Sequence, residues 1–460
     1  MTTLKLISPV DGSVYLTREA ASLEQAQAAV AAGRTAQRDW ARRPLAERIA
    51  VVQAFVAALI AMHEEVVPEL AWQMGRPIRY GGEFGGVKER ADYMAGIAEA
   101  ALAPIGIEHG EAFRRFIARE PLGLVLVIAP WNYPYLTAIN TIAPALIAGN
   151  AVLLKHATQT LQVGERFQMA ADAAGLPRGL FTNLALDHAV TEQLLGSGAV
   201  DFVNFTGSVA GGRAMERACA GTFTGLGLEL GGKDPGYVCE DADLPGAIET
   251  LMDGAMFNAG QCCCGIERIY VAAPLYEDFV DGAVAFAERY KLGSPLDPEI
   301  TLGPMAQTRF ADLVRAQTEE AVRAGARALV DADLFSEAKT GTPYLAPQVL
   351  VGVDHSMRVM REESFGPVVG IMKVAGDDEA IRLMNDSDYG LTASIWTADA
   401  DRAERIGREI DTGTIFMNRC DYLDPALCWT GRKDTGKGGS LSVIGYHNLT
   451  RPKSYHLRKR

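Results

Sequence analysis

The sequence lacks the signatures of several protein classes. It contains no CxxC pair and no two histidines at metal-ligand spacing, so it shows no pattern of a metal site. Residues 1–11 lack the basic and then apolar layout of a secretory signal. Basic residues are few, because 44 lysines and arginines face 57 acidic residues and the net charge is −13. Proteins that bind nucleic acid present basic surfaces, so we do not expect a nucleic-acid partner. Because no metal-ligand spacing is present, we do not expect a bound metal either.

The sequence also lacks an uninterrupted apolar run that reads as a membrane span. Residues 122–154 come closest, but prolines and asparagines interrupt them: Pro130, Pro134, Pro144, Asn132, Asn140 and Asn150. A helix in the bilayer would leave those polar groups unsatisfied. The stretch instead predicts a strand, a loop, a helix and a second strand. We therefore expect a cytoplasmic protein with no membrane partner.

A chain of 460 residues is too long for one hydrophobic core, so two or three domains are expected. Three helices are predicted near the N-terminus: one that begins with a capping box at Ser22 and Gln25 and runs to about Arg42, one after Pro44, and one over 83–101. Strands alternate with helices between residues 122 and 230, and again from 232 to about 440. The expected strands are 124–129, 151–155, 181–184, 201–205, 368–374 and 414–418, and the expected helices are 161–174, 208–219, 279–290 and 309–324. This spacing predicts an α/β fold with doubly wound parallel sheets, which bind ligands past the carboxyl ends of their strands.

What the sequence does contain is a run of three cysteines, in N-A-G-Q-C-C-C-G at residues 258–265. A thiolate is a strong nucleophile at neutral pH, and Gly260 permits a tight loop that can point a backbone N–H at a reacting atom. Adjacent cysteines do not readily bridge one another, because disulfide geometry is strict. On its own, the run is explained equally well by a buried cluster of small apolar side chains.

A second motif, E-L-G-G-K at residues 229–233, places Glu229 34 residues before Cys263. A carboxylate at the end of an apolar run can act as a general base for water. Together the two motifs resemble the signatures of the aldehyde dehydrogenase superfamily, and the resemblance extends from about Phe113 to the C-terminus. It implies an NAD(P)-dependent enzyme that oxidises an aldehyde to the acid through a cysteine thiohemiacetal and a thioester.

The resemblance assigns three catalytic roles. The second residue after Gly-Gln is the family's nucleophile, which places that role on Cys263, and we expect a depressed pKa for its thiol. Glu229 becomes the base that activates water. Asn132 lies in P-W-N-Y-P after an apolar strand, and the family's asparagine at this place donates to the oxygen of the thiohemiacetal. The N–H of Cys263 would supply the second donor.

The resemblance also implies a cofactor, NAD with NADP tolerated. A G-x-x-x-x-G turn from Gly207 through Ser208 to Gly212 would hold the diphosphate at a helix N-terminus, where the common G-x-G-x-x-G fingerprint is missing. Without the resemblance to the family, these residues would indicate only an ordinary strand-to-helix connection. Trp131 and Leu230, beside the catalytic motifs, are expected to contact the cofactor as well.

Two further segments complete the expected cofactor site. Glu363 and Phe365 lie in E-S-F-G-P, where the family binds the nicotinamide ribose and ring. Lys155 closes an apolar strand at the place of the family's adenosine-ribose lysine. The chain departs from the pattern at Thr158, where a glutamate often binds the ribose hydroxyls and repels a 2′-phosphate. Threonine removes that repulsion, so we expect use of NAD and tolerance of NADP.

The expected domains follow from these positions. Residues 1–105 and 121–231 would form the dinucleotide-binding domain, 232–440 the catalytic domain, and 106–120 with 441–460 an oligomerisation arm. In the resembled family the arm pairs with the last strand of a neighbouring subunit, which here would lie near Ser454 to Leu457. The implied assembly is a homodimer or a homotetramer.

The substrate is the least determined feature. Aromatic residues near the motifs predict an apolar funnel and a medium-chain aliphatic or aromatic aldehyde: Phe257, Tyr133, Tyr422 and Trp429. Relatives that act on succinate semialdehyde often carry an arginine where this chain has Met256 or Phe257, although Arg419 on a later loop could substitute. Two alternatives stay open, an enzyme that passes the thioester to coenzyme A and a catalytically silent relative. Glu229 disfavours the first, since its role would be to activate water, and the co-occurrence of Cys263, Glu229 and Asn132 disfavours the second.

Overall fold

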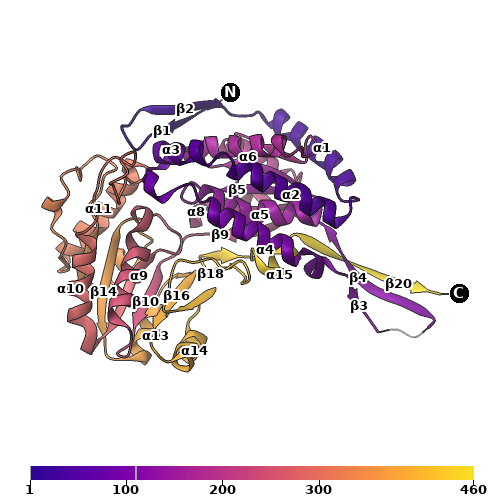
Figure 1. Ribbon diagram of the computed structural model, residues 1–460. Coiled ribbons are helices and arrows are strands. Elements are labelled where there is room, and N and C mark those ends of the chain that lie inside the picture. Colours follow the sequence, from indigo (N-terminus) through magenta and orange to yellow (C-terminus); the bar gives the residue numbers. More distant parts are fainter. Residues whose placement is uncertain (1, 109–110, 460) are drawn as a thin grey trace.

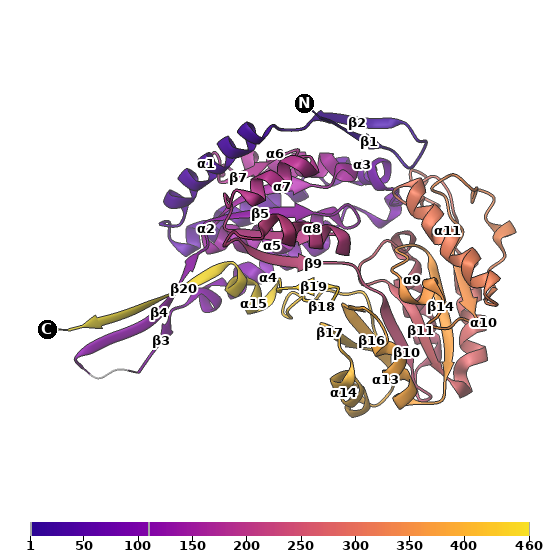
Figure 2. The same ribbon diagram turned by 180° about the vertical axis from the view of Figure 1, so that it is seen from behind.

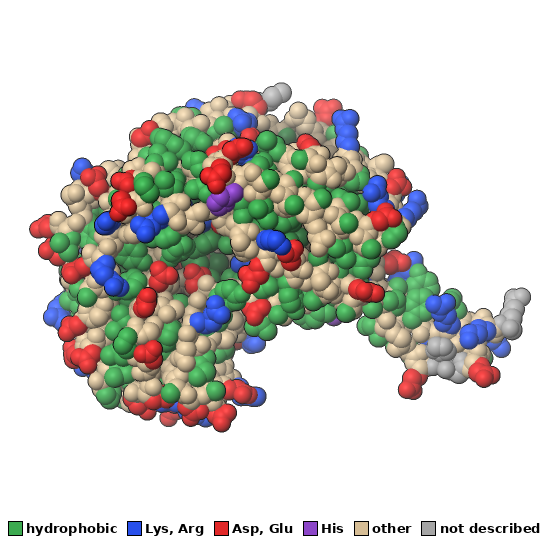
Figure 3. All heavy atoms as spheres, viewed as in Figure 1, with side chains coloured by type: hydrophobic (Ala, Val, Ile, Leu, Met, Phe, Trp, Pro, Cys, Tyr) green, Lys and Arg blue, Asp and Glu red, His purple; other side chains and the backbone are tan. Residues whose placement is uncertain are grey.

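The protein contains two large sheets flanked by helices and a narrow arm that projects from the body and carries the C-terminus (Figure 1). The computed structural model describes residues 2–108 and 111–459. The expected α/β class, with two mainly parallel sheets and a small β arm, is confirmed. Acidic and basic side chains are interspersed over the face seen in Figure 3.

The first sheet has the strand order β19-β9-β8-β5-β6-β7, and every pair except β19–β9 is parallel. The chain starts it in the centre at β5, builds outward through β6 and β7, and returns to the other side of β5 with β8 and β9. The order therefore reverses between β5 and β8, and sheets of this kind bind ligands at that point. The strands are β5 (Leu124–Ala129), β6 (Ala151–His156), β7 (Phe181–Asn183), β8 (Phe202–Thr206), β9 (Gly225–Glu229) and β19 (Gly436–Lys437).

Helices cover both faces of this sheet (Figures 1 and 2). One face carries α1 (Leu23–Trp40), α7 (His188–Gly196) and α8 (Val209–Cys219), and the other carries α5 (Pro134–Ala148) and α6 (Leu161–Ala173), with α2 (Leu45–Ile60) and α4 (Phe84–Leu102) outside them. The predicted capping box is present at the start of α1. The sequence did not predict α3 (His63–Met74), because Pro68 lies inside it and interrupts the helical pattern.

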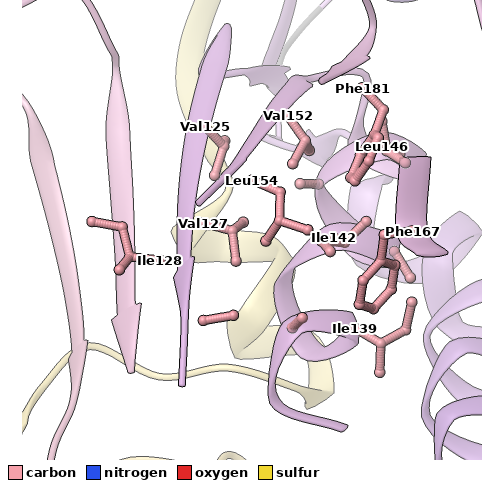
Figure 4. Close-up of a cluster of buried hydrophobic side chains, with 14 of the residues drawn as sticks. Val125, Val127, Ile128, Ile139, Ile142, Leu146, Val152, Leu154, Phe167 and Phe181 are labelled. Atoms are coloured by element: carbon pink, nitrogen blue, oxygen red, sulfur yellow. The ribbon is translucent and has the colours of Figure 1, made fainter. Parts of the chain in front are cut away.

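The core of this half lies between the central strands and α5. Strands β5 and β6 are buried along their whole length. Figure 4 shows side chains of β5, β6 and α5, among them Val127, Leu154 and Ile142, gathered in one apolar layer. A strand buried on both faces reads as a continuous apolar run, which explains why residues 122–154 resemble a membrane span in sequence.

The second sheet has the order β12-β13-β14-β11-β10-β16-β17 and is parallel except for the short β12. Its strands are β10 (Asp234–Val238), β11 (Ile266–Ala272), β12 (Arg327–Ala328), β13 (Gln348–Val351), β14 (Val368–Val374), β16 (Thr392–Trp396) and β17 (Thr414–Met417). Its helices are α9 (Leu244–Met256), α10 (Tyr276–Ala287), α11 (Thr308–Arg323), α12 (Arg358–Arg361), α13 (Asp377–Asn385) and α14 (Ala400–Glu409). All elements predicted for this half are found within a few residues of their expected bounds.

The arm is a three-stranded antiparallel sheet of β3 (Ile105–Gly106), β4 (Phe113–Pro121) and β20 (Thr450–Arg458), reached through α15 (Ser442–Asn448). Residues 109–110 of the expected arm lie outside the described residues. The expectation that the arm pairs with a neighbouring subunit's last strand is wrong for β4. The last strand of the same chain pairs with β4 over its whole length, because both segments leave the body at the same place (Figures 1 and 2).

Two small antiparallel pairs complete the fold. The N-terminal hairpin of β1 (Thr3–Ile7) and β2 (Val14–Glu19) lies on the first half and was not predicted. The two-residue strands β15 (Tyr389–Gly390) and β18 (Arg432–Lys433) pair with each other.

Within the described residues no single helix is long and apolar enough to cross a membrane. Helices α2 and α3 together have the length and composition for a span, but they are bent by 65° relative to each other.

A buried ion pair joins the starts of β10 and β11. Lys233 Nζ lies 2.5 Å from Glu267 Oε2, and both side chains are almost fully buried. Lys233 also donates to Ser364 Oγ at 2.9 Å, and Glu267 accepts the N–H groups of Ser364 and Phe365, each at 2.8 Å. The pair therefore holds the segment before β14 against the segment before β10.

We expect Lys233→Met to lower the free energy of unfolding by about 3–5 kcal/mol, because it leaves the Glu267 carboxylate buried and unpaired. Urea unfolding followed by circular dichroism measures the change. The matched control is Lys437→Met, which breaks the exposed ion pair with Glu216 and should cost at most about 1 kcal/mol. Equal stability of the two variants would contradict this prediction.

Candidate active site

Cys263 lies on the loop that joins α9 to β11. Residues Phe257–Gly260 form one 3-10 turn, in which Asn258 and Ala259 have left-handed φ angles of 54° and 56°. Gly260 is left-handed too, and a Cβ there would lie 2.3 Å from the backbone of Gly366. Left-handed backbone is costly for residues other than glycine, and such strain concentrates at functional sites. Glycine is therefore required at position 260.

The side chain of Gln261 holds this strained turn. Its Nε2 donates to the carbonyl of Asn258 at 3.0 Å, and its Oε1 accepts the N–H of Ala306 at 2.8 Å. The loop that carries the three cysteines is thus attached both to itself and to the segment before α11.

The three thiols are close together and differ in their hydrogen bonds. The Sγ atoms of Cys262 and Cys264 are 3.5 Å apart and contact Asp421 Oδ1 at 3.1 and 2.9 Å. The neighbouring Cys262 thiol, and then that of Cys264, lower the pKa of Cys263 well below its usual value. Hydrogen bonding within the group raises the pKa of both flanking thiols, and burial raises the pKa of Asp421 to about 6. Cys263 is therefore the thiol that ionises first.

Asn132 lies on the loop after β5, at the switch point of the first sheet. Its side-chain Nδ2 donates to the carbonyl of Gln261 at 3.2 Å, and its own carbonyl accepts from Asn258 Nδ2 at 3.3 Å. The side chain is 5% exposed. The structure thus brings the amide predicted to bind the oxyanion to the cysteine loop.

Glu229 ends β9, next to the same loop. Its Oε2 accepts the hydroxyl of Thr206 at 3.2 Å, and its Oε1 is buried without a partner among the described residues. Burial raises the pKa of this carboxyl, and the nearby hydroxyls of Ser440 and Thr206 oppose that rise. A buried carboxylate oxygen without a donor can take up a proton, as a general base must.

Two cavities meet at these residues. The first has a volume of about 280 Å³ and the second about 270 Å³, and both are lined by Thr206, Glu229, Leu230 and Cys263. The first extends between α4, α5 and the loop around Asp421. The second extends past the turn at Gly207 toward Glu363 and Phe365. Cys263 can therefore contact one ligand on each side.

The four aromatic residues predicted to form a funnel all line the first cavity: Tyr133, Phe257, Tyr422 and Trp429. Arg419, the expected substitute for a missing arginine, does not line it, and its guanidinium lies 3.9 Å from the ring centre of Tyr422. The ring hydroxyl of Tyr422 donates to Glu89 at 2.7 Å.

Most residues predicted to bind the cofactor line the second cavity: Trp131, Gly207, Ser208, Leu230, Glu363 and Phe365. Ser208 caps α8, accepting the N–H of Gly211 at 3.2 Å, so the start of α8 faces this cavity with backbone N–H groups. Glu363 accepts the N–H of Gly232 at 2.9 Å, and burial raises its pKa to about 8.

Three predicted cofactor residues lie outside the lining of the second cavity. Gly212 is in the first turn of α8, where a Cβ would lie 2.6 Å from the side chain of Leu230. Lys155 is buried at the end of β6, and burial lowers its pKa to about 8. Thr158 starts the short turn after β6. Lys155 lies near the end of β6 and Thr158 follows that strand, which neighbours β5 on the side away from β8.

The sequence did not reveal several residues of the site. Arg76 and Glu83 form a buried ion pair beside Asn132, and Arg90 and Asp421 line the first cavity. None belongs to a short motif, because each meets its partners through tertiary contacts. A charged residue within an otherwise apolar helical face, as at Arg90 on α4, is the one available signal.

Comparison with known proteins identifies one family. A family model described as "Aldehyde dehydrogenase family" matches residues 1–455. A succinate-semialdehyde dehydrogenase (NADP(+)) of Deinococcus radiodurans is 31% identical over 450 residues, covering 97% of this chain and 93% of its own. A geranial dehydrogenase of Castellaniella defragrans is 34% identical over 439 residues, covering 94% and 91%.

A solved structure gives the same result. An indole-3-acetaldehyde dehydrogenase complexed with NAD+ superposes with a TM-score of 0.94 at 29% identity, covering 99% of this chain and 93% of that one. The geometry of the two cavities agrees with such an enzyme, since one thiol faces both. The chain therefore belongs to the aldehyde dehydrogenase family and is an oxidoreductase that oxidises an aldehyde with NAD(P)+.

Proposed function

We propose that Cys263 is the nucleophile of this oxidation, that Glu229 is the general base, and that Asn132 binds the oxyanion. The observation that carries the proposal is the position of Cys263 and Glu229 at the junction of the two cavities. The first cavity would hold the aldehyde and the second the cofactor. The residues then act on one carbon atom from opposite sides.

The first step is attack of the Cys263 thiolate on the aldehyde carbon. The C–S bond forms, and the carbonyl oxygen takes the negative charge. Asn132 Nδ2 and the N–H of Cys263 donate to that oxygen. Removing one such donor typically costs about 10²–10³ in kcat. The lowered pKa of the Cys263 thiol favours its thiolate, which is the form that attacks the carbon.

The residues around the second cavity fit NAD(P)+. Backbone N–H groups at the start of α8 suit a diphosphate, and Leu230, Trp131 and Phe365 offer apolar surface to rings. Glu363 would bind the nicotinamide ribose, and Lys155 with Thr158 the adenosine ribose. When bound, NAD(P)+ supplies the acceptor for the hydride of the thiohemiacetal.

The second step is hydrolysis of the resulting thioester on Cys263. Glu229 takes a proton from water through its unpartnered Oε1, and the water oxygen attacks the thioester carbon. The C–S bond breaks, Cys263 leaves as a thiolate, and the carboxylic acid departs. Glu229 thus favours water over coenzyme A as the acceptor of the acyl group.

We infer a cytoplasmic location from the thiols. All seven cysteines are free, including three with close neighbours, and thiols of this kind persist in reducing compartments. A small aldehyde is the expected partner, and neither nucleic acid nor a membrane is proposed.

We also infer a homodimer or homotetramer in which the arm makes the contact. The arm is an edge-exposed antiparallel sheet that leaves the body, and it carries exposed apolar residues, among them Ile105 and Leu457. Exposed strand edges readily pair with another chain.

Cys263→Ala should abolish aldehyde oxidation, and Glu229→Gln should form NADH in a single burst and then turn over about 10²–10⁴ times more slowly. Stopped-flow absorbance of NADH measures both. Cys219→Ala, a buried cysteine away from the site, is the control. Normal turnover by Cys263→Ala would disprove the assignment, and a burst relieved by coenzyme A would favour the acylating alternative.

Initial rates with each cofactor test the reading of Thr158. The unaltered enzyme should use NAD and tolerate NADP, whereas Thr158→Glu should lose NADP activity selectively, since a carboxylate repels the 2′-phosphate. The matched control is Thr35→Glu, because Thr35 is exposed on α1 and lines neither cavity, and it should leave the rates with both cofactors unchanged. Strict dependence on NAD in the unaltered enzyme would contradict the expected tolerance.

Light scattering should give the mass of two or four chains. Ile105→Asp should reduce that mass, because it places a charge on the exposed surface of the arm. Val14→Asp, on the exposed N-terminal hairpin, is the matched control and should leave the mass unchanged. A monomeric unaltered enzyme would exclude the proposed assembly.

A further inference from the structure

Residues of α4 and of the N-terminal half of α5 that line the first cavity carry buried hydrogen-bond donors, and these donors have no acceptor among the described residues. We propose that this wall is a subsite for an oxygen acceptor, a carboxylate or a hydroxyl, carried on the chain of the aldehyde substrate. The inference rests on the proposed function, because it assigns the first cavity to the aldehyde. It adds a polar requirement to the aromatic funnel expected from the sequence.

Arg90 is the main support for this subsite. It is 8% exposed and lines the cavity that contains Cys263. Its Nη1 donates to the carbonyl of Leu136 at 2.9 Å and to Asn140 Oδ1 at 3.1 Å, both neutral acceptors. Its Nε is buried with no acceptor among the described residues. Arginine keeps its charge in proteins, so a buried guanidinium without a counter-ion remains here.

The carboxylates whose charge acts on Arg90, and Asp421 in the lining of the same cavity, have other partners. Glu83 pairs with Arg76, and Asp421 accepts the two flanking thiols. Glu89 is exposed and accepts the hydroxyl of Tyr422. Glu229 accepts from Thr206. Among the described residues none of them forms an ion pair with Arg90, so a ligand is the remaining source of a strong acceptor.

Two neutral donors line the same cavity. The hydroxyl of Tyr133 and Nδ2 of Asn140 are buried without partners in the described part of the chain. The oxygen of Asn140 faces Arg90, so its free group is the donor. Asn140 also borders a separate cavity of about 10 Å³, which has room for about one water as an acceptor, so Arg90 is the stronger support for the subsite. A cluster of donors favours a substrate with acceptor oxygens.

Matched pairs of aldehydes test the subsite. Succinate semialdehyde and isocaproaldehyde differ by a carboxylate in place of an isopropyl group, and glycolaldehyde and propanal differ by a hydroxyl in place of a methyl group. In at least one pair the oxygen-bearing aldehyde should have a kcat/KM higher by about 10- to 100-fold, mainly through KM. Arg90→Met should remove that preference. Loss in the first pair identifies a carboxylate ligand, and loss in the second pair a hydroxyl ligand.

Arg48→Met is the control for this experiment. Arg48 is a half-buried arginine on α2 whose partners are backbone carbonyls, and it does not line the first cavity. Its replacement should leave the preference within either pair unchanged. A preference that survives in Arg90→Met, or that is missing from the unaltered enzyme, would overturn the subsite.

A different result is expected if Arg90 only stabilises the fold or only acts on the charge of the Glu229 carboxyl. In that case Arg90→Met would lower kcat for all four aldehydes alike and would shift the pH profile of kcat, with the preference intact. That outcome overturns the subsite but leaves the proposed function standing. Failure of the unaltered enzyme to form NADH with any aldehyde would overturn the proposed function itself.

A second measurement needs no folded variant. Iodoacetamide alkylates Cys263 in the unaltered enzyme, and acids that correspond to the products should protect it. Succinate should protect more strongly than isocaproate, or glycolate more strongly than propionate, by about tenfold or more in concentration. Equal protection within both pairs would overturn the proposal.

Discussion

The buried guanidinium of Arg76 joins the two segments from which the candidate active site is built. It donates to the carbonyl of Asn132 at 2.5 Å and to Asn258 Oδ1 at 3.3 Å, and it forms an ion pair with Glu83. Asn132 follows a strand of the first sheet, whereas Asn258 belongs to the cysteine loop before β11. The side chains of the ion pair are 3% exposed, so loss of one partner would leave a buried charge. The position of the amide relative to the thiol therefore depends on this cluster.

The same cluster extends to the walls of the first cavity. Glu83 Oε2 accepts the N–H groups of Tyr135 and Leu136 at 3.0 and 2.8 Å, in the first turn of α5. A carboxylate at this end of a helix is stabilised by the unsatisfied N–H groups. Glu83 also precedes the first residue of α4, with a left-handed φ of 68°. The helices that carry Arg90 and Asn140 are thus placed by the ion pair that places Asn132.

The two sheets approach the site in opposite senses. The first sheet contributes segments that follow its strands, such as those at Asn132 and Gly207, as parallel sheets usually do. The second sheet contributes segments that precede its strands: the loop of Cys263 before β11 and that of Glu363 before β14. The expectation that ligands lie past carboxyl ends therefore holds for one half only. The buried Lys233–Glu267 pair keeps the amino ends of the second sheet together.

Much of the fold was predictable from sequence because buried parallel strands and amphipathic helices leave periodic patterns. The positions of Cys263, Glu229 and Asn132 were predictable because each lies in a short motif beside the end of a strand. Arg76 was not, since two of its three side-chain partners are 56 and 182 residues away and no local pattern marks them. The pairing of β4 with β20 of the same chain was also not predicted. The sequences of the two strands do not indicate whether a strand pairs within its own chain or with a neighbouring chain.

The site combines a large apolar core with a few polar atoms that have no partner in the described part of the protein. Glu229 Oε1, Arg90 Nε and the Tyr133 hydroxyl are of this kind, and an unsatisfied buried polar group costs about 1–3 kcal/mol. In a core strand such costs would select against these residues. In the proposed reaction they would leave an acceptor for a proton of water and donors for a ligand, in surroundings where hydrogen bonds are stronger than in water. Water and substrate would then complete these hydrogen bonds and recover the stability lost at the wall of the cavity, which would couple binding to the geometry that the reaction needs.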